Sequence, residues 1–189
     1  MLSLTKIPEE FITRKNVVIQ YGEDNDETIC IRTFIFDDES QIEKPTLVML
    51  HGFSTATVLY YPLYAPLLDH YRIIGIDLLG FGASSRVTLP EEMTKDSEAM
   101  DEYQVTWVEK WVAKMTEDNL LPEQFLLSGH SYGGYLSSLF ASRNPLRIKA
   151  LFLNSPIGHE KVPDNYDTVP IRMSSVNNEP ASAFKRDFI

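Results

Sequence analysis

The strongest indication of the fold is the segment FLLSGHSYGG, residues 125–134. Its apolar start is typical of a buried strand, and the residues from Tyr132 onward are typical of a helix, so the chain turns sharply between the two. Ser131 stands in this turn, with Gly129 two positions before it and Gly133 two positions after it. A tight strand-to-helix turn strains the serine backbone and leaves room only for small residues at those two positions. The pattern predicts a serine hydroxyl that stands clear of the sheet.

This turn also predicts chemistry. The N-terminus of the helix offers free backbone N–H groups and a positive dipole to a developing negative charge. Ser131 is therefore a candidate nucleophile, with His130 in the supporting turn. The alternative is a glycine-rich turn that binds phosphate, but such a turn needs a following Lys-Ser or Lys-Thr pair, and Tyr132-Gly133-Gly134 follow the serine instead.

Three more short apolar runs surround this stretch in the sequence. Thr46–Leu50 and Arg72–Ile76 precede it, and Lys149–Leu153 follows it. Runs that are apolar on both faces are typical of strands covered on both sides, as in a parallel sheet. Upstream, Phe11–Gln20 and Thr28–Phe36 are rich in β-branched and aromatic residues and flank a polar turn, so they predict an antiparallel hairpin.

Helices are expected between the apolar runs. Thr57–Tyr71 is one, with an irregular start because it contains Pro62 and Pro66. Ser97–Leu120 is the clearest, and Tyr132–Arg143 is the third. The apolar residues of the clearest helix fall on one face at three- and four-residue steps, which predicts a core face: Met100, Tyr103, Trp107, Val108, Trp111, Val112 and Met115.

The fold class that follows is an α/β open sheet of about six strands, an antiparallel hairpin first and parallel strands after it. Three motifs end its strands: HGF at 51–53, DLLGFGAS at 77–84 and GHSYGG at 129–134. In this order and spacing they resemble the α/β-hydrolase superfamily of serine hydrolases, and within it the lysophospholipase and acyl-lipase-like branch. The resemblance covers about residues 15–158.

The resemblance implies roles for these motifs. The backbone N–H groups of Phe53 and Tyr132 would form the oxyanion hole, and Gly52 would let the backbone turn toward the pocket. For His51, a structural role that fixes this loop is favoured over a catalytic one. The DLLGFGAS motif would shape the edge of the site through structural residues: Asp77, Gly80, Gly82 and Ser84.

The sequence also departs from the pattern of this family. An acid and a histidine should follow the serine in chain order. Of the four histidines, His51, His70, His130 and His159, only His159 follows Ser131, and it stands where the lid of the family begins. A structural or exposed role is therefore favoured for His159. Residues 1–158 are expected to form the N-terminal part of a hydrolase domain with six of eight strands, and 159–189 a loop or the start of a lid, truncated or complete.

Two consequences are expected from this arrangement. Lys149–Leu153 would be an apolar edge strand with unpaired backbone groups, beside an apolar patch. A second polypeptide would cover it and extend the sheet beyond 149–153. The predicted function is serine hydrolysis of carboxylic or lipid esters through an acyl-enzyme on Ser131, with the acid and histidine supplied by that polypeptide or missing. The alternative is a catalytically inactive subunit of a larger complex. A third reading, a small-molecule binding module, rests only on the cluster Tyr60, Tyr61 and Tyr64.

Composition indicates which classes of partner are disfavoured and which compartment to expect. The net charge of −10 disfavours nucleic acid or an anionic membrane as the main partner. No segment has the roughly 18 apolar residues of a transmembrane helix. The single cysteine, Cys30, allows no internal disulfide, so the cytoplasm is the expected compartment and an organelle such as the mitochondrion the alternative. No cofactor or metal is expected, because His and acidic residues lack ligand spacing.

Overall fold

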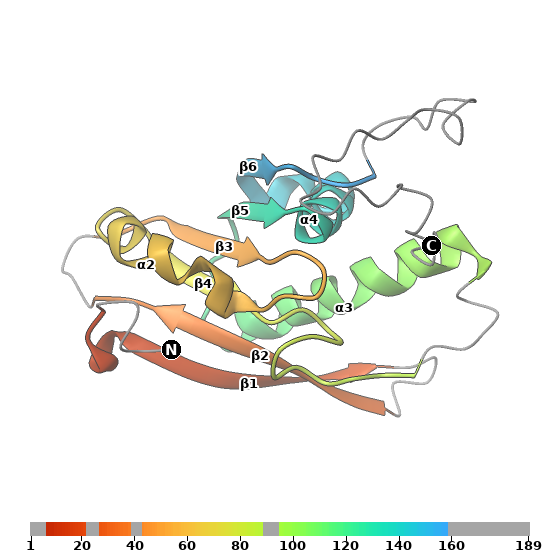
Figure 1. Cartoon of the computed structure of the whole chain (residues 1–189), viewed down its shortest axis with the longest axis horizontal. Coiled ribbons are helices and arrows are strands. Elements are labelled where there is room, and N and C mark those ends of the chain that lie inside the picture. The colour runs from red at the N-terminus through yellow and green to blue at the C-terminus, as the bar shows by residue number, and fades with distance from the viewer. Residues whose placement is uncertain (1–6, 22–26, 39–42, 89–94, 159–189) are drawn as a thin grey trace, which may run out of the picture.

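The computed structural model describes residues 7–21, 27–38, 43–88 and 95–158. Its centre is one six-stranded sheet with the order β1-β2-β4-β3-β5-β6 (Figure 1). The strands are β1 (Ile12–Tyr21), β2 (Glu27–Phe36), β3 (Thr46–Leu50), β4 (Arg72–Ile76), β5 (Phe125–His130) and β6 (Ile148–Asn154).

The hairpin and the parallel strands are both confirmed. β1 and β2 pair in antiparallel fashion over their full length. On its other side, β2 pairs with β4, also in antiparallel fashion. From β4 onward, β4, β3, β5 and β6 are all parallel. β3 therefore lies in the middle of the sheet, between β4 and β5, which places the ends of β3 and β5 side by side. The fold is the α/β open sheet predicted from the sequence.

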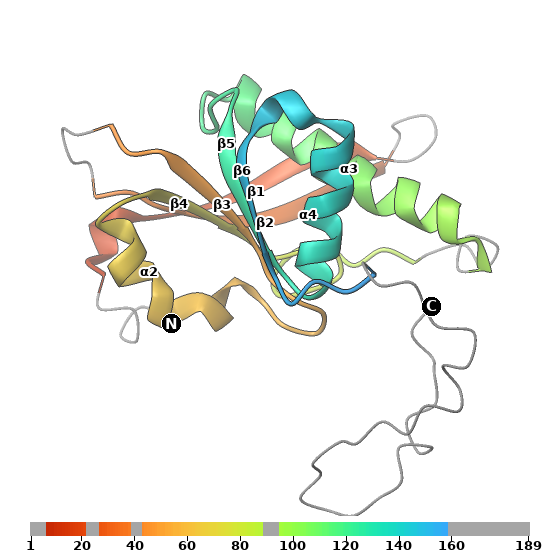
Figure 2. The same ribbon diagram turned by 90° about the horizontal axis from the view of Figure 1, so that it is seen from above.

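The helices cover both faces of this sheet. η2 (Thr57–Tyr60) and α2 (Tyr61–Leu68) lie on one face, and α3 (Ser97–Glu117) and α4 (Tyr132–Arg143) on the other (Figure 2). Two further 3-10 turns are η1 (Glu9–Phe11) and η4 (Pro145–Arg147). The helix predicted over Thr57–Tyr71 is split, because Pro62 favours a new helix start and α2 ends at Leu68, soon after Pro66.

Each face of the sheet has its own apolar core. On the α3 and α4 face, the side chains of Trp107 and Trp111 are fully buried among the strands. On the α2 face, the Tyr64 ring stacks on Phe36 with 4.2 Å between ring centroids. The two tryptophans are therefore core residues, as their helical spacing predicts.

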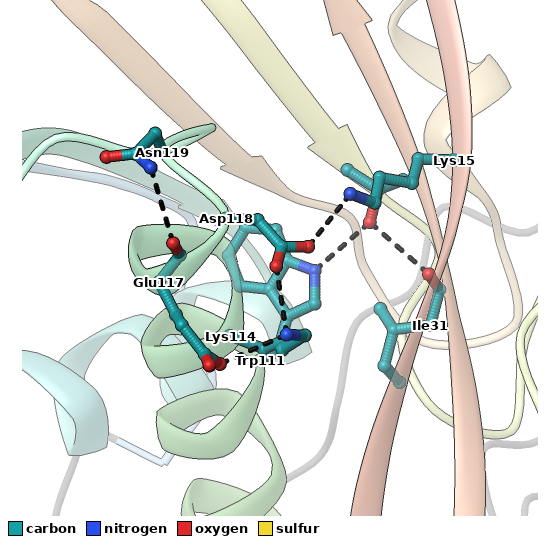
Figure 3. Close-up of polar contacts among 8 residues, drawn as sticks. Lys15, Ile31, Trp111, Lys114, Glu117, Asp118 and Asn119 are labelled. Carbon is teal, nitrogen blue, oxygen red and sulfur yellow. Dashed lines mark hydrogen bonds and ion pairs between the residues drawn. The ribbon is translucent and has the colours of Figure 1, made fainter.

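Polar contacts fix α3 on the hairpin (Figure 3). The indole Nε1–H of Trp111 donates to Thr33 Oγ1 at 3.0 Å, and both side chains are fully buried. At the helix end, the Lys15 ammonium lies 2.8 Å from a carboxylate oxygen of Asp118. A buried N–H without a partner is costly, so the bond from the Trp111 indole to Thr33 sets one position for the helix on the sheet.

β6 differs from the strands inside the sheet. Its single strand neighbour among the described residues is β5, and consecutive apolar side chains on it face solvent: Leu151, Phe152 and Leu153 are 36%, 49% and 40% exposed. The apolar edge strand expected from the sequence is thus confirmed for the part of the chain that is described.

Candidate active site

The turn between β5 and α4 has the backbone geometry that its glycines predict. Ser131 has φ 52° and ψ −116°, a conformation that L-residues rarely adopt. Its N–H donates to the Asn154 carbonyl at 3.0 Å, and its carbonyl accepts from the Tyr135 N–H at 3.1 Å. The Ser131 hydroxyl makes no capping bond to α4. Strain held by surrounding bonds is typical of functional positions.

The glycines on either side of Ser131 are packed against backbone. A Cβ on Gly129 would lie 2.2 Å from the Gly133 carbonyl oxygen. A Cβ on Gly133 would lie 2.4 Å from the carbonyl oxygens of both Leu50 and His51. These distances are far below van der Waals contact, so the lack of side chains allows α4 to approach the end of β3.

Residues 51–57, which the sequence predicts to supply an oxyanion-hole donor and which are called the oxyanion loop below, begin where β3 ends. Leu50 pairs with Gly129 in the parallel register, so the loop meets the serine turn directly. A Cβ on Gly52 would lie 3.3 Å from the Cβ of Ser131 and 3.0 Å from His130 Nδ1. The structure thus brings together two predicted motifs that are almost 80 residues apart in the sequence.

His51 is fully buried beneath this loop. Its Nε2 accepts a hydrogen bond from the Leu78 N–H at 2.9 Å, and its Nδ1 lies 2.7 Å from the Gly52 carbonyl oxygen. Burial lowers the pKa of His51, against weaker opposing effects of Gly52 and Asp77. The ring is therefore neutral near pH 7, and its contacts join the oxyanion loop to the segment after β4.

Asp77 also joins the oxyanion loop to the segment after β4, at the Thr57 end of the loop. Its Oδ1 accepts from the Thr57 N–H at 2.8 Å, and its Oδ2 accepts from the Ala83 N–H at 2.9 Å. Gly82, at φ 52°, packs so closely on this carboxylate that a Cβ would lie 2.2 Å from Oδ2. The Ser84 hydroxyl donates to the Asp77 carbonyl at 2.5 Å. The DLLGFGAS motif is thus folded around its own aspartate.

Aromatic rings cluster beside the serine turn. The Phe53 ring is 5.2 Å from Phe81 and 6.4 Å from Tyr132 between centroids, in both cases edge to face. Phe53 is 51% exposed, whereas burial raises the pKa of the Tyr132 phenol and keeps it neutral. Sequence reasoning missed Phe81 as a site residue, although it lies inside the DLLGFGAS motif.

The histidines do not complete a triad in the described part of the chain. His70 follows α2 and precedes β4, so it lies at the end of the sheet opposite to Ser131. The Nδ1 of His130 is buried and has no hydrogen-bond partner among the described residues. None of the three described histidines is hydrogen-bonded to a carboxylate, and His159 lies outside the described residues.

In the described part of the chain, no three His, Cys, Asp or Glu side chains are grouped as a metal site. No helix in this part combines the length and the apolar character that a membrane crossing requires.

Comparison with known proteins gives the same fold and family. The family described as alpha/beta hydrolase fold matches residues 45–183. A probable 1-acylglycerol-3-phosphate O-acyltransferase of Oryza sativa subsp. japonica is 34% identical over 134 residues, which are 71% of this chain and 30% of that protein. A human (Lyso)-N-acylphosphatidylethanolamine lipase is 35% identical over 125 residues, 66% of this chain and 34% of that protein. The chain spans about a third of the length of these curated relatives.

Solved structures are similar in fold. A bacterial membrane phospholipase A matches with a TM-score of 0.60 at 23% identity, over 84% of this chain and 44% of that one. The carboxylesterase CesB of Bacillus subtilis matches with a TM-score of 0.59 at 21% identity, over 82% and 46%. The curated relatives of this chain are acyltransferase- and lipase-like. The chain belongs to the α/β-hydrolase fold family.

Proposed function

We propose that this chain carries the nucleophile and the oxyanion hole of a serine hydrolase that cleaves carboxylic esters, with acyl lipids as the favoured class. The observation that carries the proposal is the strained backbone of Ser131 directly beside the Gly52–Phe53 segment. The relatives named above act on acylated glycerol phosphates and N-acylphosphatidylethanolamines by their names, which supports acyl lipids.

The proposed reaction is a double displacement. Ser131 Oγ attacks the ester carbonyl carbon while a histidine accepts its proton, and the oxyanion is bound by the N–H groups of Phe53 and Tyr132. The C–O bond to the alcohol breaks, the alcohol takes the proton, and an acyl-enzyme remains. Water then attacks this ester with the same histidine as base, which releases the carboxylic acid and restores Ser131.

The histidine and the acid are proposed to come from outside the described residues. His51 is occupied by Leu78 and Gly52, and the described histidines have no carboxylate partner. The sequence predicts that a second polypeptide supplies these residues by pairing with β6. Such pairing would cover the exposed edge of β6 and would bring the carboxyl end of the added strand near the serine turn.

A fluorophosphonate probe tests the proposal on the native protein in its natural assembly. The expected result is a covalent adduct on Ser131, located by mass spectrometry. Ser131→Ala should abolish it and leave the unfolding midpoint close to that of the wild type. Ser128→Ala, three residues earlier in β5, is the matched control and should label normally. A folded native sample without an adduct on Ser131 would refute the proposal.

The exposed edge of β6 also favours the second candidate, a catalytically inactive subunit that pairs with a partner through this strand. An interface of this kind should be large and apolar, like a domain core cut in two. Both candidates expect a complex, so fluorophosphonate labelling of Ser131 within that complex separates them: the inactive subunit would give no adduct.

A further inference from the structure

One carbonyl in the oxyanion loop accepts two hydrogen bonds. The Thr55 hydroxyl donates to the Gly52 carbonyl oxygen at 2.8 Å, and His51 Nδ1 lies 2.7 Å from the same oxygen. Thr55 Oγ1 is also 3.1 Å from His51 Nδ1, so the three groups form a closed triangle. Both lone pairs of this carbonyl are therefore used.

The direction of these bonds follows from the far side of the imidazole. Leu78 N–H donates to Nε2 at 2.9 Å, so Nε2 carries no proton. A neutral ring then has its proton on Nδ1, which must donate. The Gly52 carbonyl consequently accepts from both His51 and Thr55.

Peptide geometry carries this constraint to the oxyanion hole. The Gly52 carbonyl and the Phe53 N–H belong to one planar trans peptide, in which they point in opposite directions. Two bonds that hold the carbonyl down toward His51 and Thr55 therefore hold the Phe53 N–H away from them. Gly52 has no side chain, so this peptide could otherwise rotate at low cost.

The backbone of residues 54–57 holds Thr55 in place to bind the Gly52 carbonyl. Ser54 has φ 56°, a left-handed turn that brings the half-buried Thr55 back over Gly52. Beyond Thr55, the Thr57 N–H is bound by the Asp77 carboxylate. The loop is thus fixed at both ends, and the Thr55 hydroxyl is the part of the first anchor that a single substitution can remove without loss of shape.

We propose that Thr55 is a positioning residue, whose hydroxyl orients the Gly52–Phe53 peptide so that the Phe53 N–H donates to the oxyanion. This inference rests on the proposed function for its catalytic consequence, but its geometric content stands separately. Complete loss of an oxyanion donor typically costs about 10²–10³ in rate. A donor that is only misdirected should cost less, about tenfold.

The test uses three variants of the native protein. Thr55→Val keeps the shape and removes the hydroxyl, Thr55→Ser keeps the hydroxyl, and Thr116→Val removes a hydroxyl that donates to the Val112 carbonyl of α3. The first readout is the fluorophosphonate labelling of Ser131, resolved into probe binding and rate of bond formation. The second is the NMR shift of the Phe53 amide, which requires no activity.

Thr55→Val should slow bond formation about tenfold with little change in probe binding, and should move the Phe53 amide signal. Thr55→Ser and Thr116→Val should stay close to the wild type in both readouts. If the wild type is not labelled but the Phe53 amide moves only in Thr55→Val, the proposed function fails and the positioning stands. An unmoved Phe53 amide in Thr55→Val, or an equal loss in Thr55→Ser, would overturn the inference.

Discussion

β3 and β6 are both largely apolar strands, but their surroundings are opposite. TLVML in β3 is buried at every position, whereas IKALFLN in β6 is exposed over its last four residues. β3 is paired on both sides and covered by helices, while β6 pairs with β5 alone among the described strands. An apolar run thus specifies a strand, but its neighbours decide what that strand contributes to stability.

The ends of the two strands differ in the same way. β3 ends in the fully buried His51, which is bonded on both ring nitrogens. β6 ends in Asn154, whose side chain is exposed and whose carbonyl accepts the Ser131 N–H. The β3 end is therefore pre-organised within this chain, whereas the β6 end supports the serine turn through its backbone.

Truncation of one leucine in each strand should show the largest difference. Leu50→Ala, at a fully buried position of β3, should lower the free energy of unfolding by about 2–5 kcal/mol. Leu153→Ala, at a position 40% exposed in β6, should lower it by less than about 1 kcal/mol. Urea unfolding followed by tryptophan fluorescence measures both. Equal losses would show that the β6 edge is covered in the native state.

A methyl group added beside each strand end should give the next largest effect. Gly133→Ala would press on the Leu50 and His51 carbonyls, and should lower the free energy of unfolding by about 1–3 kcal/mol. Gly134→Ala would meet Pro156 Cβ at 2.9 Å, Pro156 Cα at 3.1 Å and the Gly129 carbonyl oxygen at 3.2 Å, but it gains helix propensity, so a smaller net loss of about 1 kcal/mol is expected. Differential scanning calorimetry of the two variants gives the comparison, and a reversed order would contradict it.

Acid should act on the end of β3. The pKa of His51 in the folded state lies below the value of about 6.5 for an exposed imidazole, because burial opposes its charge. Its contribution to stability is then complete above about pH 6.5 and falls as the pH decreases toward the folded-state pKa. His51→Gln should flatten the slope of stability below about pH 6.5, measured as urea midpoints. An unchanged slope would assign the acid sensitivity to other groups.

A charge on the β6 edge should have the smallest effect on stability. Phe152→Lys should change the free energy of unfolding by no more than about 0.5 kcal/mol, because the side chain is half exposed. It should nevertheless reduce concentration-dependent association of this chain in sedimentation velocity. Val18→Lys, on the opposite edge strand β1 and 55% exposed, is the control. Equal effects of both lysines would show that general charge, and not the β6 edge, limits association.

The sequence predicted strands better than it predicted their limits. Thr46–Leu50 and Arg72–Ile76 match β3 and β4, because apolar runs end where polar residues begin. β5 extends to His130, three residues beyond its apolar part, because neighbouring strands on both sides supply backbone partners for polar residues too. The strand order could not be read from hydrophobic pattern, since all four parallel strands share that pattern.

The site was predictable to the level of its motifs. The family resemblance named Ser131, Phe53 and Tyr132 as candidate site residues, and adjacent parallel strands account for their proximity. Thr55 and Phe81 were not foreseen, because their contacts depend on a left-handed turn at Ser54 and on how the segment after β4 folds back. Such tertiary contacts have no periodic signal in the sequence.

The central position of β3 has a consequence for synthesis on the ribosome. Both strands that flank β3 are synthesised after it. Leu50 can pair with Gly129 only after about 80 more residues have been added to the chain. At about 5–20 residues per second this interval is roughly 4–16 s. During it, one edge of the nascent β3 stays open to other chains, so the yield of folded protein should depend on chaperones that occupy this strand before β5 emerges.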